Sequence, residues 1–164
     1  MPKFGRTSRK RLDTCHVDLQ FILDLAIEYV DFSVVQGHRP VATQFDYYKR
    51  GRTMNLNGEW SVTDKSKVIT NIDGYKKKGK HNYDPSLAVD IVPYYNGKMD
   101  WDDLERFKNI VYFIKGVAFT LGYELRLGCD WDSDFENRDH SFRDLPHLEL
   151  YKFLNNDNVW EKYV

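Results

Sequence analysis

The chain has 164 residues, enough for one ordinary domain but not for two of comfortable size. Lys and Arg number 24 and Asp and Glu 25, and the resulting net charge of -1 argues against a general nucleic-acid-binding protein, which carries a basic excess. The hydrophobic share of 41% and the aromatic share of 15% support a packed core and exclude disorder as the main state.

Membrane insertion and export are not indicated by the sequence. No stretch approaches the roughly 20 apolar residues that a membrane span needs. The start of the chain is basic, but no apolar run follows it, so it does not resemble a secretory signal. Cys15 and Cys129 are far apart in the sequence, and we expect both to be reduced and partly buried.

The first third of the chain predicts a basic arm, a helix and a strand. Residues 1–12 are expected to form a solvated arm; weak attraction to an anionic surface such as a cell wall is the alternative. A short strand is expected at residues 32–35. Between them, three- and four-residue spacing of apolar side chains predicts a helix capped by Asp13 or Thr14, with Cys15, Leu19, Ile22, Ala26 and Tyr29 on one stripe.

The middle of the chain is less regular. A second helix is expected over about residues 41–50, ending at Gly51. Residues 51–87 show little periodicity, and so long an irregular segment in a compact domain usually has a function. Within it, residues 76–78 are three lysines, interpreted as a solvated turn.

The remaining elements are more regular. Residues 88–92 predict a buried strand interrupted by Asp90, and burying a lone carboxylate costs several kcal/mol unless it is paired. A helix is expected over residues 101–121, with Gly122 at its carboxyl-terminal cap. Alternating strands follow at 123–127 and 147–150. Helices interleaved with short strands indicate an α+β fold in one domain, residues 1–164.

Three polar residues with metal-binding side chains stand in otherwise structured surroundings: His81, Asp90 and His147. Two imidazoles and one carboxylate leave the fourth position of a zinc ion open for water, as in catalytic sites. The alternative is structural, since a buried Asp is more often a satisfied acid and a His at a strand end is more often ordinary packing. The other histidines, His16, His38 and His140, have no ligand spacing and are expected to be structural or exposed.

At these residues the sequence resembles a known family. The segments His81-Asn82-Tyr83, Leu87-Ala88-Val89-Asp90 and Asp144-Leu145-Pro146-His147-Leu148-Glu149 are similar to signatures of the zinc peptidoglycan peptidases, D-Ala-D-Ala carboxypeptidases and L-alanyl-D-glutamate endopeptidases. Wider relatives include the hedgehog signalling domain. Gln36-Gly37-His38-Arg39, with Gln44 and Gly51 after it, and Leu127-Gly128-Cys129-Asp130-Trp131 extend the resemblance over nearly the whole chain.

The resemblance implies a small antiparallel sheet that carries a zinc site and packs against helices. His81, Asp90 and His147 would bind Zn²⁺, Asp144 would be the acidic catalytic residue, and Arg39 the cation near the scissile carbonyl. Without the resemblance, a surface ion pair would be the better interpretation of Arg39. Glu149 should share a strand face with His147 and support that ligand.

Two features depart from the family pattern. The separation from His81 to Asp90 is two residues longer than is common, through Asp84-Pro85-Ser86, and Gly79 stands where the family usually has Ser. We expect a bulge between the two ligands to absorb the extra residues.

An acidic loop precedes Asp144. Asp130, Asp132, Asp134 and Glu136 alternate as in a calcium loop, but Phe135 and Ser141 stand where an EF-hand needs Gly and Glu. We expect a solvated acidic loop, with a weak divalent site as the alternative.

The resemblance thus implies a zinc peptidase of the phage endolysin type, cutting the L-alanyl-D-glutamate bond of bacterial peptidoglycan, and we expect it to be a monomer. It would be made in the host cytoplasm without its own signal and act on the wall after release, with no nucleic-acid partner and no membrane span. The alternatives are a D,D-carboxypeptidase acting on D-Ala-D-Ala ends and a non-catalytic zinc-stabilised binding domain. Nucleic-acid binding through residues 76–80 is weakened by the balanced charge.

Overall fold

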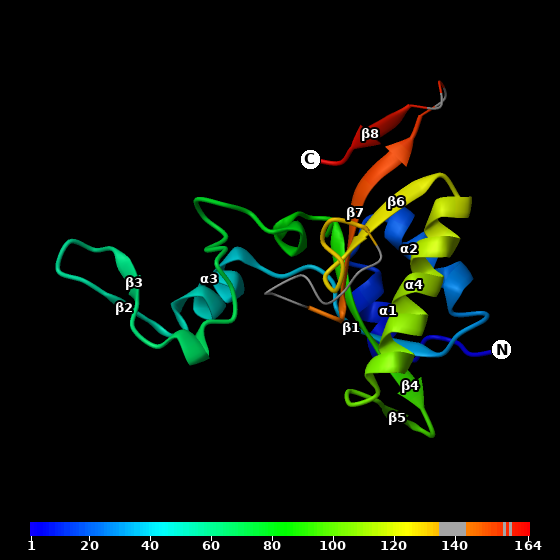
Figure 1. The fold of residues 1–164 in the computed structure, drawn as a ribbon, viewed down its shortest axis with the longest axis horizontal. Helices are drawn as coiled ribbons and strands as arrows, with labels where there is room; N and C mark the ends of the chain where they lie inside the picture. The colour runs from blue at the N-terminus through cyan, green and yellow to red at the C-terminus, as the bar shows by residue number, and fades with distance from the viewer. Residues whose placement is uncertain (135–143, 156, 158) are drawn as a thin grey trace.

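The computed structural model describes residues 1–134, 144–155, 157 and 159–164. At its centre lies an antiparallel sheet, with short strands added to two of its members and helices packed around it (Figure 1). This arrangement confirms the α+β prediction. The sheet order is β1 (Phe32–Gln36), β4 (Ala88–Tyr95), β7 (His147–Leu154) and β6 (Tyr123–Leu127), with β5 (Lys98–Met99) paired to β4 and β8 (Trp160–Lys162) paired to β7.

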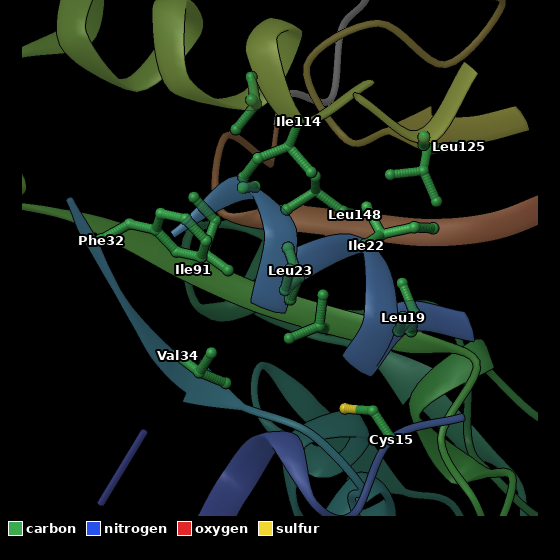
Figure 2. Close-up of a cluster of buried hydrophobic side chains, with 14 of the residues drawn as sticks. Cys15, Leu19, Ile22, Leu23, Phe32, Val34, Ile91, Ile114, Leu125 and Leu148 are labelled. Carbon is green, nitrogen blue, oxygen red and sulfur yellow. The ribbon is translucent and has the colours of Figure 1, made fainter. Parts of the chain in front are cut away.

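The two faces of this sheet have different roles. Helices α2 (Val17–Ala26) and α4 (Leu104–Thr120) supply apolar side chains that pack on the face bearing Ile91 and Leu148 (Figure 2). Because successive residues of a strand point to opposite faces, Asp90 and His147 lie on the other face of the same strands. The core therefore anchors the strands whose polar residues form the site.

Helix α4 and strand β6 match their predictions closely. The helix begins at Leu104, after the predicted start, because the Asp103 carboxylate caps it by accepting a hydrogen bond from the Arg106 amide at 2.9 Å. It ends before Gly122, whose φ of +84° suits a residue without a Cβ. Both cysteines are free and buried, as expected.

The amino-terminal segment differs from its prediction. Residues 6–12 form helix α1 (Arg6–Leu12), whose Leu12 is fully buried, so the solvated-arm prediction is wrong there. The Ser8 hydroxyl accepts a hydrogen bond from the Val34 amide at 3.1 Å, which fastens this helix to β1. Helix α2 starts at Val17, not at Asp13, because His16 caps it by accepting from the Asp18 amide at 3.3 Å.

Residues 41–80 form a lobe that projects from the body, on the left in Figure 1. It contains α3 (Val41–Lys49), which confirms the second predicted helix, the hairpin of β2 (Arg52–Met54) with β3 (Trp60–Val62), and the 3-10 turn η1 (Lys65–Lys67). Another 3-10 turn, η2 (Lys80–Asn82), leads back into the body. The prediction of an irregular segment over 51–87 is wrong for this hairpin, whose short, mostly exposed strands have no apolar periodicity to reveal them.

The remaining differences lie at strand ends. Strands β4 and β7 each continue past the predicted ends, and β8 was not predicted. Within the described part of the chain, no helix combines the length and the apolar character needed to cross a membrane.

Candidate metal centre

Strand register places two of the three predicted ligands side by side. In the antiparallel ladder between β4 and β7, Asp90 is directly opposite His147. His81 lies in η2, whose return to β4 is fixed by a hydrogen bond from the Leu87 amide to the Lys80 carbonyl at 3.0 Å. The longer segment between His81 and Asp90 therefore still brings both side chains to one point.

The three side chains converge through one atom each. His81 Nε2 lies 3.1 Å from Asp90 Oδ1, His147 Nδ1 lies 3.2 Å from the same oxygen, and the two nitrogens are 3.2 Å apart. A tetrahedral ion with bonds of about 2.0 Å separates neighbouring ligand atoms by about 3.3 Å. The triangle thus has the size of one face of a tetrahedral zinc site, and the three residues form a group able to hold a metal ion.

In each imidazole, the ring nitrogen that faces away from Asp90 is engaged in a hydrogen bond, so the other nitrogen is the one that could bind a metal ion. His81 Nδ1 donates to the Gly37 carbonyl at 2.8 Å, and His147 Nε2 donates to the Glu149 carboxylate at 3.0 Å. Since a carbonyl and a carboxylate only accept, these bonds leave His81 Nε2 and His147 Nδ1 as the nitrogens that could bind a metal ion once it has displaced any proton there. Glu149 lies on the same strand face as His147, as predicted, and Arg126 on β6 donates to it through Nε at 2.8 Å.

Electrostatics of the centre favour a cation between these atoms. Burial acts to raise the pKa of Asp90, but hydrogen bonds from His147 and His81 outweigh it and hold the pKa well below its usual value. Burial acts to lower the pKa of His147, yet its bonds to Asp90 and Glu149 raise it to about 9. A proton is thus held strongly where a metal ion would sit, and metal binding must displace it.

Arg39 lies at the edge of this centre. Its guanidinium is 3.5 Å from Asp90 Oδ2 through one nitrogen and donates to Gln44 Oε1 at 3.0 Å through another. Gln44 is itself buried and donates to the Ile72 carbonyl at 2.8 Å. The Tyr47 ring lies 5.2 Å from the guanidinium carbon. The ion pair of the alternative interpretation is thus present, but Arg39 makes it with Asp90 at the edge of the metal centre.

Asp144 stands beside the metal centre without joining the three ligand atoms. A turn closed by a hydrogen bond from the His147 amide to the Asp144 carbonyl, 3.0 Å long, holds it next to the strand. The Asp144 amide donates to the Gly128 carbonyl at 2.7 Å. Burial raises the pKa of Asp144, partly offset by the nearby His147. The group is therefore biased toward holding a proton.

These residues line one cleft of about 500 Å³. The ligands, Asp144 and Arg39 line it from the body of the protein, and the lobe supplies a wall that includes Ile69, Ile72 and residues 77–80. Trp131 lies on another side, with its ring centroid 5.5 Å from that of His147. A cleft of this size admits a short peptide segment.

The other candidates lie elsewhere. His16 caps α2, in agreement with its structural interpretation, and His38 does not belong to the metal-binding group. Asp130, Asp132 and Asp134 gather their carboxylates in a second group. Asp130 is completely buried and accepts from the Tyr112 hydroxyl at 3.2 Å, so the solvated-loop prediction is wrong for this residue. Phe135, Glu136, His140 and Ser141 lie outside the described residues.

Sequence reasoning missed three supports of the site. Gly37 offers only a backbone carbonyl, which no side-chain pattern reveals. Arg126 alternates with apolar residues on β6, and this pattern indicates only that its side chain lies on the polar face of the strand. It does not predict the hydrogen bond to Glu149. Gly128 is closely packed, since a Cβ there would lie 2.3 Å from the Asp144 carbonyl oxygen.

Comparison with known proteins gives three consistent results. The family model described as phage L-alanyl-D-glutamate peptidase matches residues 1–151. The L-alanyl-D-glutamate peptidase of Escherichia phage T5 is 33% identical over 153 residues, which cover 90% of this chain and 97% of that protein. The crystal structure of the Serratia marcescens L-Ala D-Glu endopeptidase ChiX matches with a TM-score of 0.59 and 21% identity, covering 90% of both chains, and this likeness supports the fold.

Proposed function

This chain belongs to the phage L-alanyl-D-glutamate peptidase family, and we propose that it uses zinc to cut the L-alanyl-D-glutamate bond of bacterial peptidoglycan. The observation that carries the metal part of this proposal is the triangle of His81 Nε2, Asp90 Oδ1 and His147 Nδ1 inside a peptide-sized cleft. Membership of the family, with its peptidase activity, supports the bond and the substrate.

His81, Asp90 and His147 would hold the zinc ion. Two nitrogens and one oxygen match the ligand set of catalytic zinc, which keeps a position open for water or substrate. Bound zinc supplies Lewis acidity, which brings the pKa of water to about 7 and polarises the scissile carbonyl. The hydrogen bonds to Gly37 and Glu149 keep the two rings in the required orientation.

Asp144 would handle the proton. It lines the cleft next to the ligands but keeps its carboxylate outside the ligand group. A carboxylate in that place can accept a proton from the attacking water and return it to the leaving amine, as amide hydrolysis requires.

Arg39 would interact with the scissile carbonyl. Its side chain lines the cleft and is held by Asp90 and Gln44, so its charge is oriented before substrate arrives. A fixed positive charge stabilises the negative charge that develops on the carbonyl oxygen during attack. Guanidinium suits this role because it stays protonated throughout the reaction.

As a member of a phage family, the protein would act as a monomeric lysin that reaches the wall from the host cytoplasm after release. Purified protein added to isolated cell walls should clear them, stop clearing after chelation and resume with added zinc. Clearing that persists after complete metal removal contradicts the zinc proposal.

Mass spectrometry of the products identifies the bond. Cleavage between L-Ala and D-Glu in defined muropeptides releases a fragment that begins with D-Glu. Release of a terminal D-Ala instead would show a D,D-carboxypeptidase, and binding to walls without any product would show a zinc-stabilised binding domain.

A further inference from the structure

The positively charged side chains that line the cleft outnumber its carboxylates. Two of its three side-chain carboxylates are engaged within the site, since Asp90 contacts both imidazoles and Arg39, and Glu149 accepts from Arg126. The third, Asp144, lies beside the ligands. Arg39 and Arg126 therefore each face a carboxylate of the protein. The remaining cations of the cleft are three lysines of the lobe wall: Lys77, Lys78 and Lys80.

These lysines differ in what holds them. Lys80 Nζ donates to the backbone carbonyl of Tyr163 at 3.4 Å and to that of Val164. Lys77 and Lys78 are exposed, and within the described residues neither has a carboxylate partner within ion-pair distance. The Lys78 ammonium lies 5.7 Å from the centre of the Tyr83 ring. Among the residues that the structure describes, the two cations on this wall of the cleft thus have no partner carboxylate.

The backbone that carries these two lysines is firmly placed. Asp73 Oδ1 accepts hydrogen bonds from the amides of Tyr75, Lys76 and Lys77 at 2.9 to 3.0 Å, and the Gly74 amide donates to the Lys77 carbonyl at 3.0 Å. Gly74 has a φ of +83°, and a Cβ there would lie 3.1 Å from Gln44 Cγ. The turn is therefore packed against α3, and the backbone of its lysines is held at a defined place on the wall of the cleft.

We propose that Lys77 and Lys78 select substrates by binding the free carboxylate of the D-glutamyl residue. This inference rests on the proposed function, in which the scissile bond joins L-Ala to D-Glu. A glutamyl residue has two carboxyl groups, and whichever one continues the peptide, the other remains as a carboxylate beside the scissile bond. Two cations on the cleft wall complement the negative charge of that carboxylate, whereas the corresponding carboxamide is neutral.

Two peptides that differ in one group test this proposal. One contains L-Ala-D-Glu with a free side carboxylate, and the other contains the carboxamide at that position. We expect the wild-type protein loaded with zinc to prefer the carboxylate in kcat/KM by about five- to twentyfold, less at high salt. In the double variant Lys77→Gln/Lys78→Gln the ratio should fall toward one. Because each variant is measured with both peptides, a general loss of activity cancels in the ratio of the two kcat/KM values.

Lys76→Gln is the control, because Lys76 belongs to the same turn and its replacement also removes a positive charge, one against two in the double variant, but Lys76 does not line the cleft. It should keep the wild-type ratio. Equal cleavage of both peptides by the wild type, an unchanged ratio in the double variant, or an equal loss in Lys76→Gln would each overturn the inference. Cleavage of neither peptide would instead contradict the proposed function itself.

Discussion

The two sides of the cleft are built by different means. On the sheet side, β4 and β7 form a continuous ladder, and the register that pairs Asp90 with His147 also sets the distance between their side chains. On the lobe side, the wall carries Ile69 and Ile72 on irregular backbone tied to α3 by side-chain contacts of Gln44. The geometry of the metal ligands therefore depends on backbone pairing. The substrate wall depends on a few polar side-chain contacts, and these can change without disturbing the metal ligands.

Loss of a ligand should have the largest effect. His147→Ala removes one of three ligand atoms and leaves Glu149 and Arg126 without the imidazole they support. We expect bound zinc to fall from one ion per chain to near zero, with wall clearing lowered more than about 10³-fold, because a three-ligand site depends on each ligand. Metal analysis and turbidity measure the two results. His81→Ala and Asp90→Ala should behave in the same way.

His16→Ala is the control for this prediction. It removes a helix cap worth about 1 kcal/mol and lies outside the metal-binding group, so zinc content should stay at one per chain. Stoichiometric zinc in His147→Ala would exclude that residue as a ligand.

Asp144→Asn tests proton transfer separately from metal binding. The amide keeps the size of the side chain but cannot accept the proton, and general acid–base catalysis contributes roughly 10²–10⁴ in rate. We expect kcat to fall within that range while zinc content stays at the wild-type level. Asp46→Asn, at an exposed position of α3, is the control and should keep full activity. Near-normal kcat in Asp144→Asn would remove it as the base.

The difference between the two sides also explains what the sequence could predict. Alternation and apolar stripes depend on burial against the core, so they located β4, β6, β7 and α4. The hairpin of β2 and β3 was missed because its strands bury little. The three ligands could be named as residue types, but their contact depends on the pairing of distant strands, which no local pattern encodes. The family resemblance supplied the roles of Asp144 and Arg39, which remain proposals.

Gly128→Ala tests how closely the sheet side is packed. A Cβ at this position would lie 2.3 Å from the Asp144 carbonyl oxygen and 2.9 Å from His147 Cβ. Since the contact is with backbone, the strand ends must move, and we expect the free energy of unfolding to fall by about 1–3 kcal/mol in urea titrations. Wall clearing should fall as well, because the shift reaches Asp144 and His147.

Gly116→Ala provides the opposite result in the same assay. A Cβ at Gly116 meets nothing within 4 Å, and the residue lies inside helix α4. Alanine there should stabilise the protein by about 0.5–1 kcal/mol. If Gly128→Ala is no less stable than the wild type, the close packing at the sheet edge is not required.

Gln44→Ala removes hydrogen bonds on the lobe side of the cleft, and its effect on activity should be the smallest of the series. It removes the contacts of the amide with Arg39, Thr70 and Ile72, so the Arg39 charge and the cleft wall both lose an anchor. A buried hydrogen-bond network of this kind is worth about 1–3 kcal/mol, and we expect kcat/KM to fall about tenfold, mainly through KM, while zinc content is unchanged. Gln20→Ala removes one hydrogen bond to the Cys15 carbonyl, 2.8 Å long and away from the cleft, and should leave KM unchanged. Loss of zinc in Gln44→Ala would show that the lobe helps to hold the metal centre, and the two sides of the cleft would then act as one unit.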